Sequence, residues 1–245
     1  MPSSKSKSSS ASNREYYDAF ASSYDHGRDR GYHRLIDQQA SALVRRFAEG
    51  RSVLEVGCGT GLILQQVAKF AKEARGVDLS PNMLEQACSR GLQVAQADCR
   101  ELPFPAAHFD VVYSFKVLAH VREYKKALDE MTRVLKPGGK MIIDSYNRNS
   151  LRYLIKKSFG PRKTSVAFDE QAILTRFVTP QEMKAELPHE LRILGRAGIR
   201  IFTLHPMMLR VPGLAAFVES LEWHFMDSAM ADFAGFYVLF LERSP

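Results

Sequence analysis

The stretch Val53-Leu54-Glu55-Val56-Gly57-Cys58-Gly59-Thr60-Gly61 decides the fold of this chain. A short strand-like run leads directly into a loop with three glycines, and a helical pattern over residues 62–70 follows. Glycine lets a backbone approach a ligand closely, and the free N–H groups at the start of a helix attract polar or anionic ligands. The stretch therefore predicts a strand, a tight ligand-binding loop and a helix.

The spacing of the three glycines distinguishes two kinds of nucleotide-binding loop. The dinucleotide pattern G-x-G-x-x-G places its third glycine at the sixth position, which Leu62 occupies here. Glu55, two residues before the first glycine, would also lie close to a bound pyrophosphate. Both features disfavour a nicotinamide-dependent reductase. Taken alone, the glycines could also serve only a tight turn between strand and helix.

Short apolar runs alternate with amphipathic helical patterns on both sides of the glycine loop, which predicts a parallel sheet with helices on both faces. Strands are expected at residues 52–56, 73–77, 92–97, 110–114 and 140–145, and helices at 62–70, 81–89 and 123–135. Ser80-Pro81 marks a helix start, and Pro137-Gly138-Gly139 ends the last of these helices. Two further strands are expected at 199–204 and 236–242, with an apolar helical segment between them.

Composition narrows the class of protein. The chain has 245 residues, 45% of them hydrophobic, and a formal net charge of +7, as in ordinary globular proteins. Residues 1–13 form a Ser- and Lys-rich tail that is expected to be disordered, and residues 14–245 a single domain. No apolar run approaches the ~20 residues that span a bilayer. The three cysteines form no C-x-x-C pair, so a cytoplasmic location without a bound metal is expected.

Five segments in order resemble the class I S-adenosylmethionine-dependent methyltransferases, and the nearest group is the ubiquinone/menaquinone-methyltransferase-like (methyltransferase type 11) group. The segments are the glycine stretch, Gly76-Val77-Asp78-Leu79-Ser80, Ala97-Asp98-Cys99, residues 109–115 and residues 133–139. Residues 14–25 resemble the segment that folds over the cofactor in this group. The resemblance covers residues 52–145 and depends on the whole set, since any one segment is weak by itself.

The resemblance implies a Rossmann-like α/β fold: a seven-stranded, mostly parallel sheet with an antiparallel last strand, helices on both faces and a helical cap. It implies S-adenosylmethionine as cofactor. Asp78 would accept the ribose hydroxyls, Asp98 the adenine amine, and Tyr24, or less favourably Tyr17, would lie near the methionine moiety. The full set of implied cofactor contacts is Tyr24, Glu55, Gly57, Cys58, Gly59, Gly61, Asp78, Leu79, Met83, Asp98, Cys99 and Phe115.

The acceptor side is less clearly marked in the sequence. A cap is expected from residues 14–50, 146–178 and 205–232. Histidine is the usual base near neutral pH, which makes His120, His205 and His224 candidates, although a structural role for His120 is the stronger reading. Large apolar residues between 207 and 230 favour an apolar acceptor. The acid-free segment 146–168, with Arg148 and Arg152 among its cations, suits an anionic acceptor, RNA, lipid headgroups or simply solvent.

The leading hypothesis is therefore methyl transfer from S-adenosylmethionine to an O, N or C atom of a small, apolar metabolite. Two alternatives stay open: an RNA-modifying methyltransferase and a non-catalytic module that binds the nucleoside. Peripheral contact with a membrane is compatible with the pattern, and the oligomeric state is left open.

Overall fold

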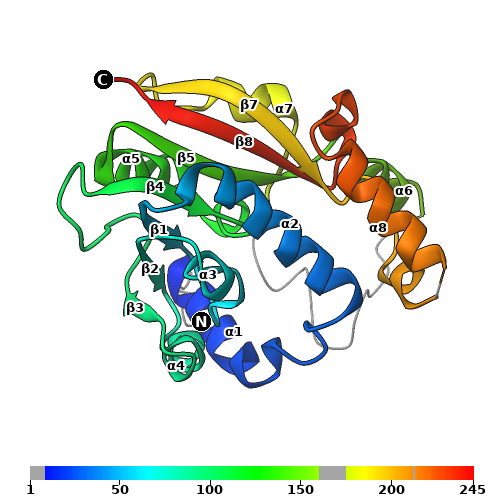
Figure 1. Cartoon of the computed structure of the whole chain (residues 1–245), viewed down its shortest axis with the longest axis horizontal. Coiled ribbons are helices and arrows are strands. Elements are labelled where there is room, and N and C mark those ends of the chain that lie inside the picture. Colours follow the sequence, from blue (N-terminus) through cyan, green and yellow to red (C-terminus); the bar gives the residue numbers. More distant parts are fainter. Residues whose placement is uncertain (1–8, 160–174, 212) are drawn as a thin grey trace, which may run out of the picture.

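A single sheet of eight strands forms the centre of the molecule (Figure 1). The computed structural model describes residues 9–159, 175–211 and 213–245. The strands are β1 (Ser52–Val56), β2 (Glu73–Asp78), β3 (Gln93–Gln96), β4 (Phe109–Ser114), β5 (Leu135–Asn147), β6 (Phe177–Val178), β7 (Leu191–Ile199) and β8 (Phe236–Arg243). The main path runs β3-β2-β1-β4-β5-β8-β7, and β6 pairs with the end of β5.

The expected Rossmann-like topology is confirmed, with one addition. Strands β1 to β5 are parallel, and β8 lies antiparallel between β5 and β7. The main path has the expected seven strands, and the two-residue strand β6 adds an eighth through Tyr146 and Asn147 of β5. A strand of two residues is too short to show an alternating pattern in the sequence.

Helices cover both faces of the sheet. The helices and 3-10 turns are α1 (Ser9–Tyr24), α2 (Gly31–Ala48), α3 (Leu62–Val67), α4 (Pro81–Ser89), η1 (Leu118–His120), α5 (Tyr124–Val134), α6 (Leu151–Phe159), α7 (Pro180–Ala185), η2 (Pro206–Arg210), α8 (Leu214–Phe225) and η3 (Ala229–Phe233). One core cluster joins α5 and α7 to the sheet, and a second joins α2 and α3 to its other face. Helices are needed on both faces because the parallel strands carry apolar side chains on both sides.

Several boundaries differ from the sequence-based expectation. Helix α3 ends at Val67 rather than at residue 70, and β5 covers Leu135–Asn147 rather than 140–145, so Pro137 lies inside the strand. Helix α1 begins at Ser9, inside the segment expected to be a disordered tail, while residues 1–8 lie outside the described residues. The strand expected at 199–204 is wrong, because β7 ends at Ile199. Arg200 has a φ of +66°, which breaks the strand, and the carboxylate of buried Glu222 accepts the N–H groups of Ile201 and Thr203 at 2.8 Å each. A side chain therefore replaces the strand partner expected there.

The arrangement of β1 and β4 creates the place for a ligand. β1 pairs with β2 on one side and with β4 on the other, so the chain order reverses between β1 and β4. In open α/β sheets, ligands bind beyond the carboxyl ends of the strands at such a switch point. Helix α1 lies across this end of the sheet, next to α4 (Figure 1).

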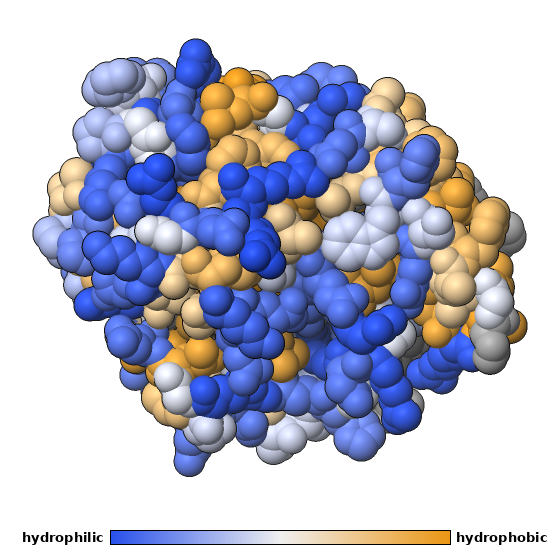
Figure 2. All heavy atoms as spheres, in the orientation of Figure 1, coloured by the Kyte–Doolittle hydropathy of each residue, from blue (hydrophilic) through white to orange (hydrophobic). Residues whose placement is uncertain are grey.

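The segment 205–232 forms η2, α8 and η3 at the edge of the molecule rather than one long helix. Some of its large apolar side chains are exposed, with Met207 60% and Phe217 61% accessible, whereas Leu209, Val218 and Met226 are buried. Figure 2 shows apolar surface along the edge where α8 lies in Figure 1. In the described part of the chain, no helix is both long and apolar enough to cross a membrane.

Candidate active site

The glycine loop after β1 closes tightly onto β2. The N–H groups of Gly57 and Cys58 donate to the carbonyl of Val77 at 2.7 and 2.9 Å. Gly57 has a φ of +79°, and a Cβ on it would lie 2.2 Å from a methyl carbon of Val117. Only glycine fits there. The Cβ position of Gly59 meets no atom within 4 Å, so the loop leaves open space on its outer side.

A cavity of about 140 Å³ lies in front of this loop. Ten of the residues predicted from the sequence line it, and they come from strands and loops far apart in the chain. They are Tyr24, Gly57, Gly59, Asp78, Leu79, Met83, Asp98, Cys99, Phe115 and His120. Sequence reasoning did not single out Arg100, Lys116 and Arg122, which also line the cavity, and it ranked Tyr17 below Tyr24, although both face it.

Asp78 ends β2 with its carboxylate inside the cavity wall. One oxygen accepts the N–H of Gly59 at 2.8 Å, and the other accepts the N–H of Ser80 at 2.9 Å. Burial raises the pKa of this carboxyl above its ordinary value, although the hydrogen bonds from the backbone oppose the shift. Each oxygen keeps a further lone pair, so the held carboxylate can still accept two hydroxyl groups.

Asp98 is held by a neighbouring cation. The guanidinium of Arg100 donates to both carboxylate oxygens, at 2.9 and 2.7 Å, and also pairs with Glu123. The bonds from Arg100 lower the pKa of Asp98, although partial burial opposes them. Next to it, burial raises the pKa of the Cys99 thiol to about 12, so the thiol stays protonated at neutral pH.

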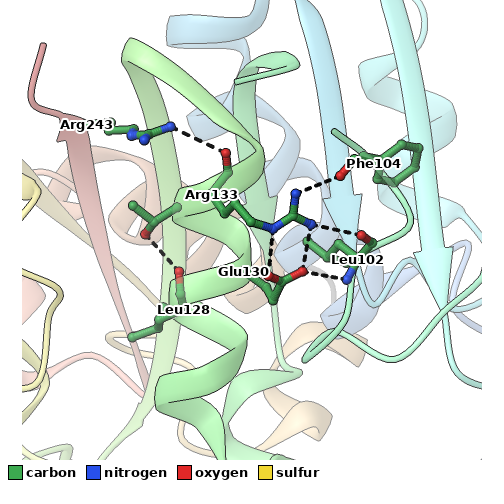
Figure 3. A network of polar contacts seen from close by, with 7 residues as sticks. Leu102, Phe104, Leu128, Glu130, Arg133 and Arg243 are labelled. Atoms are coloured by element: carbon green, nitrogen blue, oxygen red, sulfur yellow. Dashed lines mark hydrogen bonds and ion pairs between the residues drawn. The ribbon is translucent and has the colours of Figure 1, made fainter. Parts of the chain in front are cut away.

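The loop that carries Asp98 and Cys99 is tied to helix α5 by Arg133 (Figure 3). The Arg133 guanidinium donates to the carbonyls of Phe104 at 2.8 Å and Leu102 at 3.0 Å, and to both oxygens of Glu130. Glu130 in turn accepts the N–H of Leu102 at 2.8 Å. The cluster closes the loop between β3 and β4, and it therefore fixes one wall of the cavity.

Three residues predicted as cofactor contacts do not line the cavity. Glu55 lies beneath the glycine loop and accepts a hydrogen bond from Tyr113 Oη at 3.0 Å. Cys58 turns its thiol into a small core cluster with Leu64. Gly61 begins α3 and abuts Leu92, which a Cβ would approach to 2.3 Å.

Burial controls the ionisation of the Glu55 carboxyl. It raises the pKa to about 8, against the opposing hydrogen bond from Tyr113 and the positive charge of Lys116. Glu55 is therefore mostly protonated at neutral pH.

Two aspartates hold helix α1 beside the cavity through hydrogen bonds and an ion pair. Asp18 accepts a hydrogen bond from the hydroxyl of Ser80, and its carbonyl accepts Asn82 Nδ2 at 3.1 Å. Asp25, just beyond the helix, accepts Thr60 Oγ1 at 2.7 Å and pairs with Arg90. These bonds bring the rings of Tyr17 and Tyr24 to the cavity wall.

The three candidate histidines lie in different places. His120 is 5% accessible in η1 after β4, lines the cavity, and has its Nδ1 3.5 Å from Thr175 Oγ1. His205 is exposed, and its Nδ1 accepts the N–H of Met207 at the start of η2. His224 is exposed on α8, and its ring is steeply inclined to that of Phe225. His205 and His224 do not line the cavity, because η2 and α8 pack against each other and against the first turns of α2.

Lys116 follows β4 and occupies an unusual backbone conformation. Its φ is +63°, its N–H donates to Asp144 at 2.8 Å, and its Nζ lies 3.0 Å from the buried Asp37 carboxylate of α2. Burial opposes the charge on Lys116, but Asp37 prevails, and the net effect raises the pKa of the amine. Burial also raises the pKa of Asp144 to about 7. A positive charge is thus held at the cavity wall.

Comparisons with known proteins agree with this geometry. A family model described as "Methyltransferase domain" matches residues 54–143. An uncharacterized protein of Methanocaldococcus jannaschii is 33% identical over 174 residues, which are 70% of this chain and 79% of that protein. A sterol 4-C-methyltransferase of Caenorhabditis elegans is 34% identical over 105 residues, 40% of this chain and 31% of that protein. The chain thus spans about a third of the sterol enzyme's length.

A solved structure from Thermotoga maritima, titled as an S-adenosylmethionine-dependent methyltransferase and possible histamine N-methyltransferase, has the same fold. It superposes with a TM-score of 0.70 at 20% identity, over 94% of this chain and 99% of that one. Fold and cavity thus define a Rossmann-like α/β protein with a cavity in front of its glycine loop. The chain belongs to the class I S-adenosylmethionine-dependent methyltransferases, whose cofactor is S-adenosylmethionine.

Proposed function

We propose that this chain transfers a methyl group from S-adenosylmethionine to an O, N or C atom of a small acceptor. The observation that carries the proposal is one cavity that joins Asp78 at the end of β2 and Asp98 after β3 to Phe115 and His120 beyond β4. The two aspartates are acceptors for the polar groups of a nucleoside. The space beside Phe115 and His120 would hold the second reactant, the methyl acceptor.

The residues present fit the cofactor. Asp78 retains free lone pairs for two ribose hydroxyls, and the open space outside Gly59 admits a ligand against the loop. Met83, which is 1% accessible, and Leu79 offer an apolar wall for an adenine ring. Asp98 and the Cys99 backbone would meet its polar edge. Tyr24 would lie near the methionine end, with Tyr17 beside it.

When bound, S-adenosylmethionine supplies a methyl carbon on a positively charged sulfur; a bond from the acceptor atom forms as the carbon–sulfur bond breaks, and the electron pair stays on sulfur. The protein's task is mainly to align the acceptor with that carbon at about 3 to 3.5 Å. His120 is the group placed to take a proton from an acceptor that must lose one, because it lines the cavity beside Phe115. The Thr175 hydroxyl next to His120 Nδ1 would orient the ring.

The shape of the cavity favours a small molecule over RNA. Asp18 and Asp25 hold helix α1 beside the cavity, and Tyr17, Tyr24 and Phe115 are among the residues that line it. These rings suit a flat or aromatic body. The exposed apolar residues of η2 and α8 do not line the cavity, so they give no support to a wholly apolar acceptor.

The test is transfer of a radiolabelled methyl group from S-adenosylmethionine to a panel of phenols, quinones, sterols, amines and bulk tRNA. We expect label in one class of small molecule, and at least a hundredfold lower rate in His120→Asn if the acceptor loses a proton. His224→Asn, which changes an exposed histidine on α8, is the matched control and should keep the wild-type rate. Label found only in tRNA would contradict the proposal.

A further inference from the structure

We propose that Arg28 and Lys116 form a binding site for an acidic group on the methyl acceptor, so that the substrates of this chain are small carboxylic or similar acids. This inference rests on the proposed methyl transfer. It replaces a neutral apolar acceptor by an anionic one, and it names the side chains that select it.

The conformation of Lys116 is the first observation. A positive φ in a residue other than glycine costs about 1–3 kcal/mol and persists only where the surroundings enforce it. Here Asp144 holds the Lys116 N–H and Asp37 holds its Nζ, so one carboxylate fixes each end of the residue. The result is a charged lysine that lines the cavity, two residues after the end of β4. Asp37 uses one of the three N–H donors of Lys116.

Arg28 supplies the second cation. It lies in the turn between α1 and α2, with its guanidinium carbon 3.9 Å from the centre of the Tyr24 ring, which lines the cavity. Among the described residues, no carboxylate lies within 4 Å of the Arg28 side chain, whereas most half-buried arginines of this chain have one. A half-buried guanidinium without an anion is unfavourable, and its five donors match a carboxylate well.

The charges around Arg28 and Lys116 favour the binding of an anion. His33, on the first turn of α2, has its pKa lowered to about 4, mainly by burial and then by the positive charges of Arg28 and Lys116. Burial raises the pKa of Tyr17, and the positive charge of Arg28 opposes this rise. Asp37 neutralises one of the two cations, which leaves one positive charge next to the place expected for a positively charged sulfur. An acidic acceptor would balance that charge.

The experiment is calorimetry on protein saturated with S-adenosylhomocysteine, titrated with aromatic and aliphatic monocarboxylates, each paired with its primary amide. Such pairs differ in charge while keeping nearly the same shape. We expect at least one acid to bind ten times more tightly than its amide. Arg28→Gln should abolish that preference while keeping the affinity for S-adenosylhomocysteine within twofold. Arg30→Gln, an exposed arginine in the same turn without a side-chain capping bond, is the matched control and should behave as wild type.

Lys116→Met combined with Asp37→Asn tests the second cation without leaving a buried carboxylate unpaired. Equal binding of acids and amides, or no binding of either, would overturn the proposal. So would a tenfold loss of affinity for S-adenosylhomocysteine in Arg28→Gln, because the cation would then serve the cofactor's own carboxylate. If the wild type does not bind S-adenosylhomocysteine at all, the proposed function itself fails, which is a separate result.

Discussion

Replacing Glu55 by Gln should stabilise the protein, and the gain should grow with pH. Glu55 is 3% accessible, and burial raises its pKa to about 8 from the ordinary 4.5. A carboxyl with a raised pKa binds a proton more tightly in the folded than in the unfolded state. Stability is therefore greatest below the unfolded pKa and falls as the pH rises from about 5 toward 8.

The magnitude follows from the size of that shift. One pKa unit corresponds to about 1.4 kcal/mol, so Glu55 should lower the free energy of unfolding by about 2 to 3 kcal/mol between pH 5 and pH 7. Gln keeps the acceptor oxygen for the Tyr113 hydroxyl and does not titrate. Asp144, with a pKa raised to about 7 by burial, adds a slope of the same sign that remains in the variant.

The assay is urea unfolding of wild type and Glu55→Gln at pH 5, 6, 7 and 8. We expect nearly equal stability at pH 5 and a variant more stable by about 2 kcal/mol or more at pH 8. Glu85→Gln, on the exposed face of α4, removes the same carboxylate from a solvated position and should follow the wild type. Parallel curves for wild type and Glu55→Gln, or a variant less stable at pH 8, would refute the reasoning.

Three further predictions concern the cavity and the start of helix α7. Asp78→Ala should weaken binding of S-adenosylhomocysteine more than tenfold by calorimetry, because two ribose hydroxyls lose their acceptor; an unchanged Kd in the folded variant would contradict this. Tyr24→Phe should lower the rate of methyl transfer more than it lowers Tm, whereas equal activity would remove the hydroxyl from the site. Thr179→Ala should lower the unfolding free energy by about 1 kcal/mol, because Thr179 and Glu182 cap both backbone donors at the start of α7; no change in urea unfolding would argue against the cap.

The alternating part of the fold could be predicted from local pattern. Ser80-Pro81 places the start of α4 correctly, and the strands around the glycine loop shift by only a residue or two. These elements are specified by residues within one turn or one strand, so a short window contains the information. The end of β7 is different, since it depends on Glu222, which lies 21 residues further along the chain than Ile201.

Some residues of the candidate site could likewise be predicted from local sequence, and others depend on distant parts of the chain. Asp78 ends β2 and Asp98 follows β3, and neighbouring parallel strands bring such residues to one edge of the sheet. Lys116 follows a strand as well, but a single lysine there is usually a solvated charge, and only its pairing with Asp37 of α2 marks it out. The exposed positions of His205 and His224 are set by the packing of η2 and α8, to which the local sequence gives no guide.

The central claim is that the cavity at the glycine loop binds S-adenosylmethionine. Calorimetric titration with S-adenosylhomocysteine and, separately, with NADH tests it most directly, since either ligand would have to bind against this loop. We predict binding of one S-adenosylhomocysteine per chain at micromolar Kd, with no heat from NADH. Binding of NADH without S-adenosylhomocysteine, or of neither, would contradict the assignment of the cavity bounded by Gly57, Gly59 and Asp78.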